Sequence, residues 1–383
     1  MNLFNDISNQ EFIEHYWQQK VFVTRQTLTE FIQIVDGDYL ASLACEDEIE
    51  SRVIFGHNIN GDWCCEQGPF TKKYFANLSE NNWTLLVQHI DQYEPKLRGI
   101  LDQFNFLPNW RLEDIMASYA TPGGGVGPHF DFYDVFIMQI SGSRKWELGH
   151  SCDDKTPLQD NNQIKLLSAF KSENTYTLEP GDMIYIPAGI AHWGTSLSED
   201  CISLSIGFRA PSEKDLIIET LSTMLANIDD NKLSDAIRYR DSKDSIDSHP
   251  NKINLSAQSH IIDLLSNFNN DFLKYDAVQA FGQLVTETAN EYLEDEQEIW
   301  VLDDLISLST TDKPIKLIHV VNARFAFTEN QLFVNGLTYD VDEGFSKSIC
   351  DKSIDKKMNE KECDVLLELL NQGFVKIKPI RTQ

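Results

Sequence analysis

The segment from Ser118 to Trp193 constrains the fold of this chain more than any other. A glycine-rich run at residues 122–128 (PGGGVGP) precedes His129 and Asp131, and the chain then continues in aromatic and β-branched residues. This composition predicts a β-strand that carries both polar side chains, and side chains two residues apart on a strand share a face. The glycines suit a backbone that adopts positive φ or lies close to another segment. The sequence therefore predicts a strand with a ligand-binding face.

A second contribution to the same site is predicted later in the chain. Residues 179–182 (EPGD) indicate a turn, residues 183–186 (MIYI) an apolar strand, and residues 187–189 (PAG) a second turn ahead of His192. Two histidines and one carboxylate on one side of a metal ion leave the opposite positions open, which is typical of non-haem Fe(II) oxygenases. His129, Asp131 and His192 are the predicted metal ligands. The alternative is a His-x-Asp pair that is only solvated at a strand edge.

Three stretches resemble one protein family, namely residues 118–146, 180–187 and 205–211. They are similar to the bacterial JmjC-type ribosomal oxygenases, which hydroxylate an arginine of large-subunit ribosomal protein L-sixteen. The similarity is dense over about residues 90 to 211 and looser elsewhere. It implies a mainly β catalytic domain, a JmjC or cupin double-stranded β-helix, that binds Fe(II) and uses 2-oxoglutarate and O₂ as co-substrates. An oxygenase of this kind would couple decarboxylation of 2-oxoglutarate to hydroxylation of a protein.

The resemblance also assigns binding of 2-oxoglutarate to two residues. Arg144 follows the turn after the predicted ligand strand, and an arginine at the matching position of the family pairs with the distal carboxylate. Its guanidinium offers a two-pronged donor for that carboxylate, with Lys145 as the alternative cation. Ser118 at the matching position donates its hydroxyl to the same carboxylate.

A substrate arginine needs carboxylates and aromatic faces around it. Tyr133 and Asp134 lie just past the ligand pair, and their charge and position make them candidates for substrate binding. The alternative for Asp134 is a turn cap or an ion pair with a neighbouring cation. In the strand predicted at residues 201–208, Ser203 and Ser205 could face the pocket. The alternative is that they only follow the polar–apolar alternation of a strand in the barrel wall.

The chain of 383 residues is too long for one ordinary core, and we expect three parts. Residues 1–210 would form the oxygenase domain, residues 211–295 an α-helical dimerisation region, and residues 296–383 a small α/β, winged-helix-like domain. An apolar face on so small a helical unit suggests burial against a second copy, and the resemblance implies a homodimer. The alternative is that the helices pack on their own barrel. The acidity of the chain and the lack of a basic recognition helix argue against nucleic-acid binding by the last part.

A formal net charge of −28 is the strongest compositional signal. Acidic surfaces repel nucleic acids and anionic membranes but attract basic proteins, which suits a ribosomal protein as partner. The seven cysteines show neither zinc-site nor disulfide spacing, and neither a signal peptide nor a membrane-spanning apolar run is recognisable. These features predict a cytoplasmic protein with reduced thiols.

Local patterns predict several further elements. Ser8 would cap a helix over residues 8–20, and Ser212 would cap another helix. Residues 83–89 (WTLLVQH) would form an amphipathic helix. Asn60-Gly61 and Asn335-Gly336 are typical of hairpin turns.

Two other function classes compete with the arginine hydroxylase. One is a JmjC oxygenase acting on another protein, by histidine hydroxylation or lysine demethylation. The other is a non-catalytic cupin-like binding protein. Arg144 counts against the binding protein, because such a module needs no clamp for a co-substrate.

Overall fold

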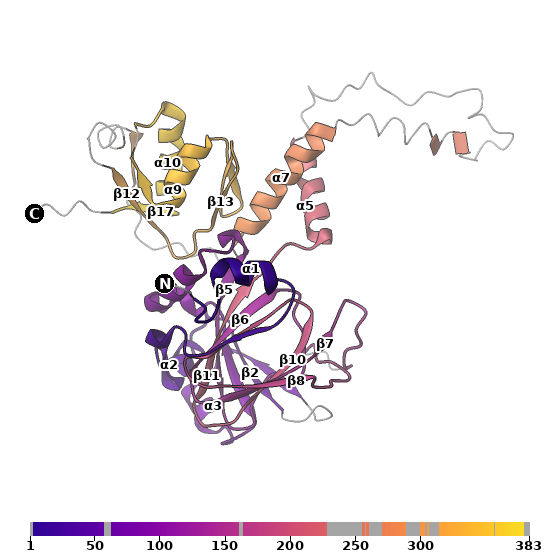
Figure 1. The fold of residues 1–383 in the computed structure, drawn as a ribbon. Coiled ribbons are helices and arrows are strands. Elements are labelled where there is room, and N and C mark those ends of the chain that lie inside the picture. Colours follow the sequence, from indigo (N-terminus) through magenta and orange to yellow (C-terminus); the bar gives the residue numbers. More distant parts are fainter. Residues whose placement is uncertain are drawn as a thin grey trace, which may run out of the picture. The chain divides into compact units, whose positions relative to one another are not determined.

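The structure is a computed structural model, and it divides the chain into two compact units, Met1–Ala210 and Pro211–Gln383 (Figure 1). It describes residues 3–56, 63–160, 164–227, 255–256, 258–259, 270–288, 299–302, 305, 314–355 and 357–378. The predicted boundary between residues 295 and 296 lies outside the described residues. The three-part division therefore stays a prediction.

The first unit is built on two antiparallel sheets. The larger sheet has eight strands in the order β1-β9-β6-β11-β5-β4-β2-β3, and the smaller has the order β10-β7-β8. The strands of the larger sheet are β1 (Phe22–Thr24), β2 (Ser51–Phe55), β3 (Cys64–Gln67), β4 (Trp83–Val87), β5 (Leu112–Ala120), β6 (Asp134–Ser141), β9 (Met183–Ile186) and β11 (Cys201–Phe208). Those of the smaller sheet are β7 (Arg144–Ser151), β8 (Asn174–Leu178) and β10 (Ile190–Ser196).

Alternation along the central strands gives the larger sheet two buried faces. On β6, Val135 and Ile137 pack with Trp146 and Leu148 of the smaller sheet, so these two faces meet across a shared core. The intervening side chain of Phe136 joins a second core on the opposite face. We call the first face the inner face and the second the outer face. Because successive strand residues point to opposite sides, each residue number decides which core its side chain enters.

Helices cover the outer face of the larger sheet. They are α1 (Asn9–His15), α2 (Gly37–Leu43), α3 (Lys72–Ala76), α4 (Arg98–Leu101) and the 3-10 turns η1 (Thr29–Phe31), η2 (Ile90–Gln92), η3 (Pro95–Leu97), η4 (Asp102–Phe104) and η5 (Asn109–Arg111). Phe12 of α1 is fully buried in this core, at 5.6 Å from the ring of Phe136. The predicted cap is confirmed, because the Ser8 hydroxyl accepts a hydrogen bond from the backbone N–H of Glu11. The Glu11 carboxylate in turn accepts one from the backbone N–H of Ser8.

One predicted helix is wrong. Residues 83–87 form strand β4, which pairs with β2 and β5 and has all five side chains buried. A strand buried on both faces reads as a continuous apolar run, which periodicity alone cannot distinguish from a short helix. The pairing of β2 with β3 agrees with the predicted hairpin, although its Asn60-Gly61 turn lies outside the described residues.

Over its described residues, the second unit combines helices with small sheets. Helices α5 (Glu213–Asn227) and α7 (Asn270–Thr286) are followed by sheets of order β16-β12-β17 and β13-β14-β15. Their strands are β12 (Ile315–His319), β13 (Phe325–Phe327), β14 (Leu332–Val334), β15 (Leu337–Tyr339), β16 (Ser353–Ile354) and β17 (Val375–Ile377), with α9 (Glu343–Cys350) and α10 (Glu360–Asn371) between them.

Two local predictions in this unit are confirmed. The Ser212 hydroxyl accepts from the backbone N–H of Asp215 at the start of α5. Asn335 and Gly336 both have positive φ, 47° and 78°, in the turn between β14 and β15. Among the described helices, none combines the length and apolarity that crossing a bilayer requires.

Candidate metal centre

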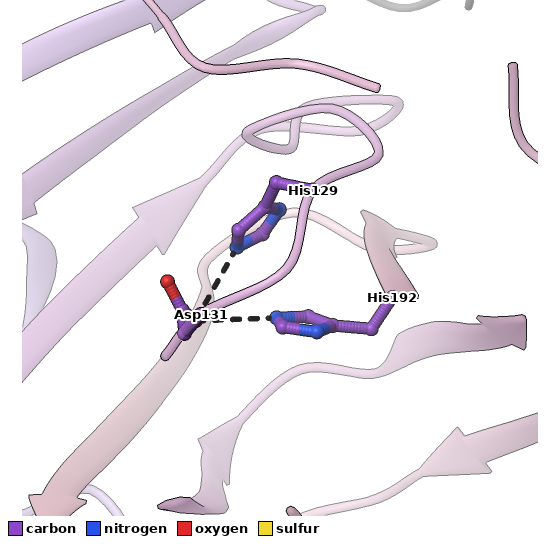
Figure 2. A group of neighbouring side chains, drawn as sticks. All are labelled: His129, Asp131 and His192. Atoms are coloured by element: carbon purple, nitrogen blue, oxygen red, sulfur yellow. Dashed lines mark ion pairs between the residues drawn. The ribbon is translucent and has the colours of Figure 1, made fainter. Parts of the chain in front are cut away.

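The structure brings the three predicted ligands together (Figure 2). The Nε2 atoms of His129 and His192 lie 3.8 Å and 3.6 Å from Oδ2 of Asp131, and the three ligand atoms lie within 4.8 Å of one another. The His192 side chain is 3% exposed, whereas those of His129 and Asp131 are 21% and 23% exposed. Two imidazoles and one carboxylate thus converge from one side, with partial access to solvent from the other.

The sequence predicted that His129 and Asp131 lie on a strand. They lie instead in the loop that precedes strand β6. The loop pairs with β10 instead: the backbone N–H of His129 donates to the carbonyl of His192 at 3.0 Å, and that of His192 donates back at 2.8 Å. The aromatic and β-branched composition does mark a strand, but β6 begins only at Asp134. The two histidines are therefore set by an isolated bridge between this loop and strand β10, and not by one strand.

Hydrogen bonds hold both imidazole rings in place. Nδ1 of His129 lies 2.9 Å from the carbonyl oxygen of Gly127, and Nδ1 of His192 lies 2.8 Å from that of Ile190. A ring whose Nδ1–H donates to a carbonyl presents Nε2 as the free lone pair. Burial, followed by the nearby His129, lowers the pKa of His192 to about 4, so its ring is neutral at physiological pH. Neutral imidazoles are what a metal ion requires.

The glycine cluster serves the two purposes expected from the sequence. A Cβ on Gly125 would collide with the carbonyl oxygen of Gly194, so only glycine lets the loop lie against β10. Gly127 has φ of +82°, a conformation that other residues rarely adopt, and its carbonyl accepts from the His129 ring. The cluster thus positions the first histidine.

Arg144 and Ser118 meet on the inner side of the same barrel. Nη1 of Arg144 donates to Oγ of Ser118 at 3.0 Å, and both residues are buried, at 4% and 3% exposure. Nη2 of Arg144 is buried without a hydrogen-bond partner in the part of the chain that the structure describes. A buried guanidinium stays charged, so this orphaned donor suits the carboxylate of a ligand. The residues present therefore fit a 2-oxo dicarboxylic acid beside a metal ion.

The alternative cation, Lys145, lies elsewhere. Its side chain is 37% exposed and pairs with Glu147 at 2.9 Å. Lys145 follows Arg144 on strand β7, so its side chain points to the opposite face. Of these two candidate cations, Arg144 is therefore the one that lies beside Ser118.

Sequence reasoning missed Asp114, which lies on β5 in line with Ser118. Residues 114, 116 and 118 alternate with Ile115 and Ala117, which belong to the outer core, so they share the inner face. Burial raises the pKa of Asp114 to about 6, an effect that the nearby His89 opposes. The four-residue spacing of Asp114 and Ser118, which puts both side chains on one face of a strand, was the signal that could have found this carboxyl.

Tyr133 and Asp134 have different surroundings. Tyr133 is partly exposed and hydrogen-bonded to Asp131, and burial together with the carboxylates of Asp131 and Asp114 raises its pKa. Tyr133 therefore borders the metal centre. Asp134 is only 1% exposed.

The expectation that Asp134 contacts a substrate needs correction. Its Oδ2 accepts from Nη2 of Arg111 at 2.9 Å, and its Oδ1 accepts from the hydroxyl of Tyr185 at 2.6 Å. Strand alternation places Asp134 in register with Phe136, on the outer face away from the pocket. The structural ion pair that the sequence left open is what the structure shows.

Comparison with known proteins finds similarity over the segment that carries this site. The JmjC domain profile matches residues 99–216. The chain is 40% identical over 209 residues to the ribosomal protein uL16 3-hydroxylase of Escherichia coli, covering 54% of each chain. It is 35% identical over 212 residues to a probable ribosomal oxygenase of Haemophilus influenzae, covering 55% of this chain and 52% of that one. The aligned part thus spans about half the length of these curated relatives.

The likeness in fold extends further than the likeness in sequence. The crystal structure of Escherichia coli YcfD matches with a TM-score of 0.81 and 26% identity, over 99% of this chain and 100% of that one. The same ribosomal oxygenase in complex with cobalt and 2-oxoglutarate matches with a TM-score of 0.79, over 98% and 99% of the two chains. Residues 99–216 of this chain thus match a JmjC domain, and the chain shares the fold of the bacterial ribosomal oxygenase YcfD.

Proposed function

We propose that this chain is an Fe(II)- and 2-oxoglutarate-dependent dioxygenase that hydroxylates an arginine side chain of ribosomal protein L-sixteen. The observation that carries the proposal is the pairing of a two-histidine, one-carboxylate cluster with a buried arginine that lacks an anionic partner among the described residues. A relative that is 40% identical over this region is named as a uL16 3-hydroxylase, which supports the substrate.

Each residue of the pocket has a distinct task in this proposal. His129, Asp131 and His192 hold Fe(II), which when bound activates O₂ with electrons from 2-oxoglutarate. Arg144 pairs with the distal carboxylate of 2-oxoglutarate through its free Nη2. The Ser118 oxygen accepts from Arg144, which leaves its own hydroxyl proton free to donate to the same carboxylate. The pocket thereby orients the co-substrate before the protein substrate arrives.

The inner face next to the metal centre supports a cationic substrate. Two carboxyls, those of Asp114 and the metal ligand Asp131, act on the phenol of Tyr133 against one nearby cation, Arg52, so a net negative charge and an aromatic ring border one region. A guanidinium favours carboxylate acceptors and aromatic faces. The net charge of −28 would also steer a basic ribosomal protein toward this chain.

We further propose that the helical part of the second unit forms a homodimer. Ile217, Leu221 and Leu225 lie at helical spacing on α5 and are 52%, 54% and 71% exposed. Such a row of exposed aliphatic side chains would be covered in a dimer. Residues 211–295 would then serve dimerisation, and residues 296–383 would form the winged-helix-like domain. A cytoplasmic location agrees with all seven cysteines being free thiols.

The experiment that tests the enzyme class measures succinate formation from 2-oxoglutarate with Fe(II) under air. The protein is assayed with and without an arginine-containing peptide of ribosomal protein L-sixteen, and the peptide is then analysed by mass spectrometry. We expect peptide-dependent turnover and a product heavier by one oxygen atom. The matched control is His192→Ala, which removes a buried ligand and should abolish both signals.

Other outcomes distinguish the competing functions. Turnover without peptide modification would retain the oxygenase but move its substrate to another protein. An absence of turnover in iron-loaded protein would favour a non-catalytic binding module. A dimer is tested separately by sedimentation, where Leu221→Glu should yield monomers and the exposed Lys214→Glu should not.

A further inference from the structure

The guanidinium of Arg144 makes two hydrogen bonds. One goes to Ser118, and the second lies on the side away from Ser118. Nε of Arg144 donates to the sulfur of Cys201 at 3.4 Å. Cys201 begins strand β11 and is fully buried, and its thiol donates to the carbonyl oxygen of Ser143 at 3.4 Å. The thiol proton is thus directed away from Arg144, so the sulfur presents its lone pairs to the guanidinium.

Gln139 fixes the position of the sulfur in turn. Its Nε2 donates to the sulfur of Cys201 at 3.3 Å and to the carbonyl of Ser141 at 2.7 Å, while its Oε1 accepts from the hydroxyl of Ser203 at 2.8 Å. Gln139 is fully buried, and Ser203 is 1% exposed. The amide therefore has a single orientation in which both of its ends are satisfied.

Strand register explains how these residues come together. Ser203 of β11 lies opposite Gln139 of β6 on one side and opposite Ser118 of β5 on the other. All three lie on the inner face, and Arg144 reaches this row from the smaller sheet. These three polar side chains form a fixed surface against which the guanidinium of Arg144 packs.

The choice of a thiol has a chemical consequence. A carboxylate beside Nε would neutralise the guanidinium, as Asp134 does for Arg111. A neutral sulfur accepts only a weak hydrogen bond and brings no negative charge, so the positive charge of Arg144 is not compensated by this contact. With Nε and Nη1 both engaged, Nη2 is the donor left without a partner in the described structure.

We propose that Cys201, oriented by Gln139, is a positioning residue that sets the guanidinium plane of Arg144 and thereby the affinity and selectivity for the distal carboxylate of 2-oxoglutarate. This inference rests on the proposed function, since it concerns how the same pocket holds its co-substrate. Cys201 acts through Arg144 and touches neither the metal centre nor the substrate.

The test compares two 2-oxo acids by calorimetric titration of Co(II)-loaded protein. 2-Oxoglutarate has the distal carboxylate, whereas 2-oxovalerate has the same chain length and ends in a methyl group. Cys201→Ala should raise the Kd for 2-oxoglutarate roughly fivefold, the value of one hydrogen bond, and leave that for 2-oxovalerate unchanged. Cys201→Ser keeps an acceptor and should stay within about twofold of wild type.

A double-mutant cycle tests whether the effect passes through Arg144. In an Arg144→Met background, Cys201→Ala should have no further effect on 2-oxoglutarate binding. Gln139→Leu should weaken binding in the same direction, and it serves as the second variant if Cys201→Ala does not fold. The matched control is Cys152→Ala, another buried cysteine of the first unit outside this network, which should leave both affinities unchanged.

Several outcomes would overturn the inference. They are an unchanged 2-oxoglutarate affinity in Cys201→Ala and Gln139→Leu, an equal loss for both acids, or an effect of Cys201→Ala that persists fully without Arg144. In each of these cases tight binding to the wild-type protein would leave the proposed function standing. A wild-type protein that binds no 2-oxoglutarate would overturn both.

Discussion

Two buried arginines of the first unit have opposite surroundings. Arg111, on the outer face, is 8% exposed and lies 2.9 Å from the carboxylate of Asp134, with its guanidinium 5.1 Å from the ring centre of Trp17. Arg144, on the inner face, is 4% exposed and contacts a hydroxyl and a thiol, with no carboxylate partner in the described structure. The same residue type is thus paired with a carboxylate on one side of the larger sheet and left without one on the other.

This contrast between the two arginines shows how a binding site can be recognised without its ligand. A guanidinium cannot lose its proton in a protein, so a buried one needs a negative group. Arg111 has this group within the fold, which identifies it as structural. For Arg144 the negative group must be supplied by a ligand, and mutations at the two arginine sites should therefore have different effects.

The largest effect is expected on the structural side. Asp134→Ala leaves Arg111 buried without its counter-ion and should lower the free energy of unfolding by about 3–5 kcal/mol. Urea denaturation at constant pH measures this value. Tyr185→Phe, which removes only one hydroxyl from the same carboxylate, should cost about 1 kcal/mol. A variant Asp134→Ala as stable as wild type would show that the ion pair is not structural.

On the ligand side, Arg144→Met should have the converse effect. The Kd for 2-oxoglutarate should rise on the order of 100-fold, because a charge-assisted pair is lost, while the free energy of unfolding without ligand should not fall. Calorimetry and urea denaturation of the same preparation measure the two quantities. If stability fell as much as in Asp134→Ala, Arg144 would be a second structural arginine and the comparison would fail.

Asp114 extends the comparison to a buried carboxyl with a raised pKa. Its pKa of about 6 in the folded protein exceeds the ordinary value of 3.8, so its contribution to stability is complete below about pH 4 and is lost as the pH rises through 6. Asp114→Asn should therefore be more stable than wild type at pH 8, by about 2 kcal/mol, and not at pH 4. Thermal unfolding across this pH range measures the difference, which a pH-independent result would contradict.

The same variant should bind a cationic substrate less well. With wild-type protein, kcat/KM for an arginine peptide should fall as the pH drops through 6, and this dependence should be weaker in Asp114→Asn. A gain in stability together with a loss of substrate affinity is expected where a carboxyl is kept buried for binding.

The smallest effect is expected at Ser118. Ser118→Ala removes one acceptor for Arg144 and one donor for the ligand, and it should raise the Kd for 2-oxoglutarate about fivefold. Ser205→Ala, on the inner face of β11 but outside the contacts of Arg144, is the control. Equal effects of the two changes would mean that Ser118 is an ordinary wall residue.

Local patterns accounted for much of the fold and of the site. The helix caps at Ser8 and Ser212, the turn at residues 335–336 and strand β9 all follow from a few neighbouring residues. The three candidate ligands and Arg144 were identified from the glycine run, the turns and the family resemblance. The helix predicted at residues 83–89 was wrong because both faces of β4 are buried, a fact that depends on the sheets around it.

Strand alternation is a local property, and it assigns Asp114 and Ser118 to one side of the larger sheet and Ile115 and Ala117 to the other. Which buried charges are paired depends instead on contacts between distant segments. Asp134 at the start of β6 pairs with Arg111 in η5, the turn before β5. Arg144 reaches Ser118 and Cys201 across two facing sheets. Such pairings join residues distant in the chain, so no local pattern encodes them, and they separate the structural arginine from the one that awaits a ligand.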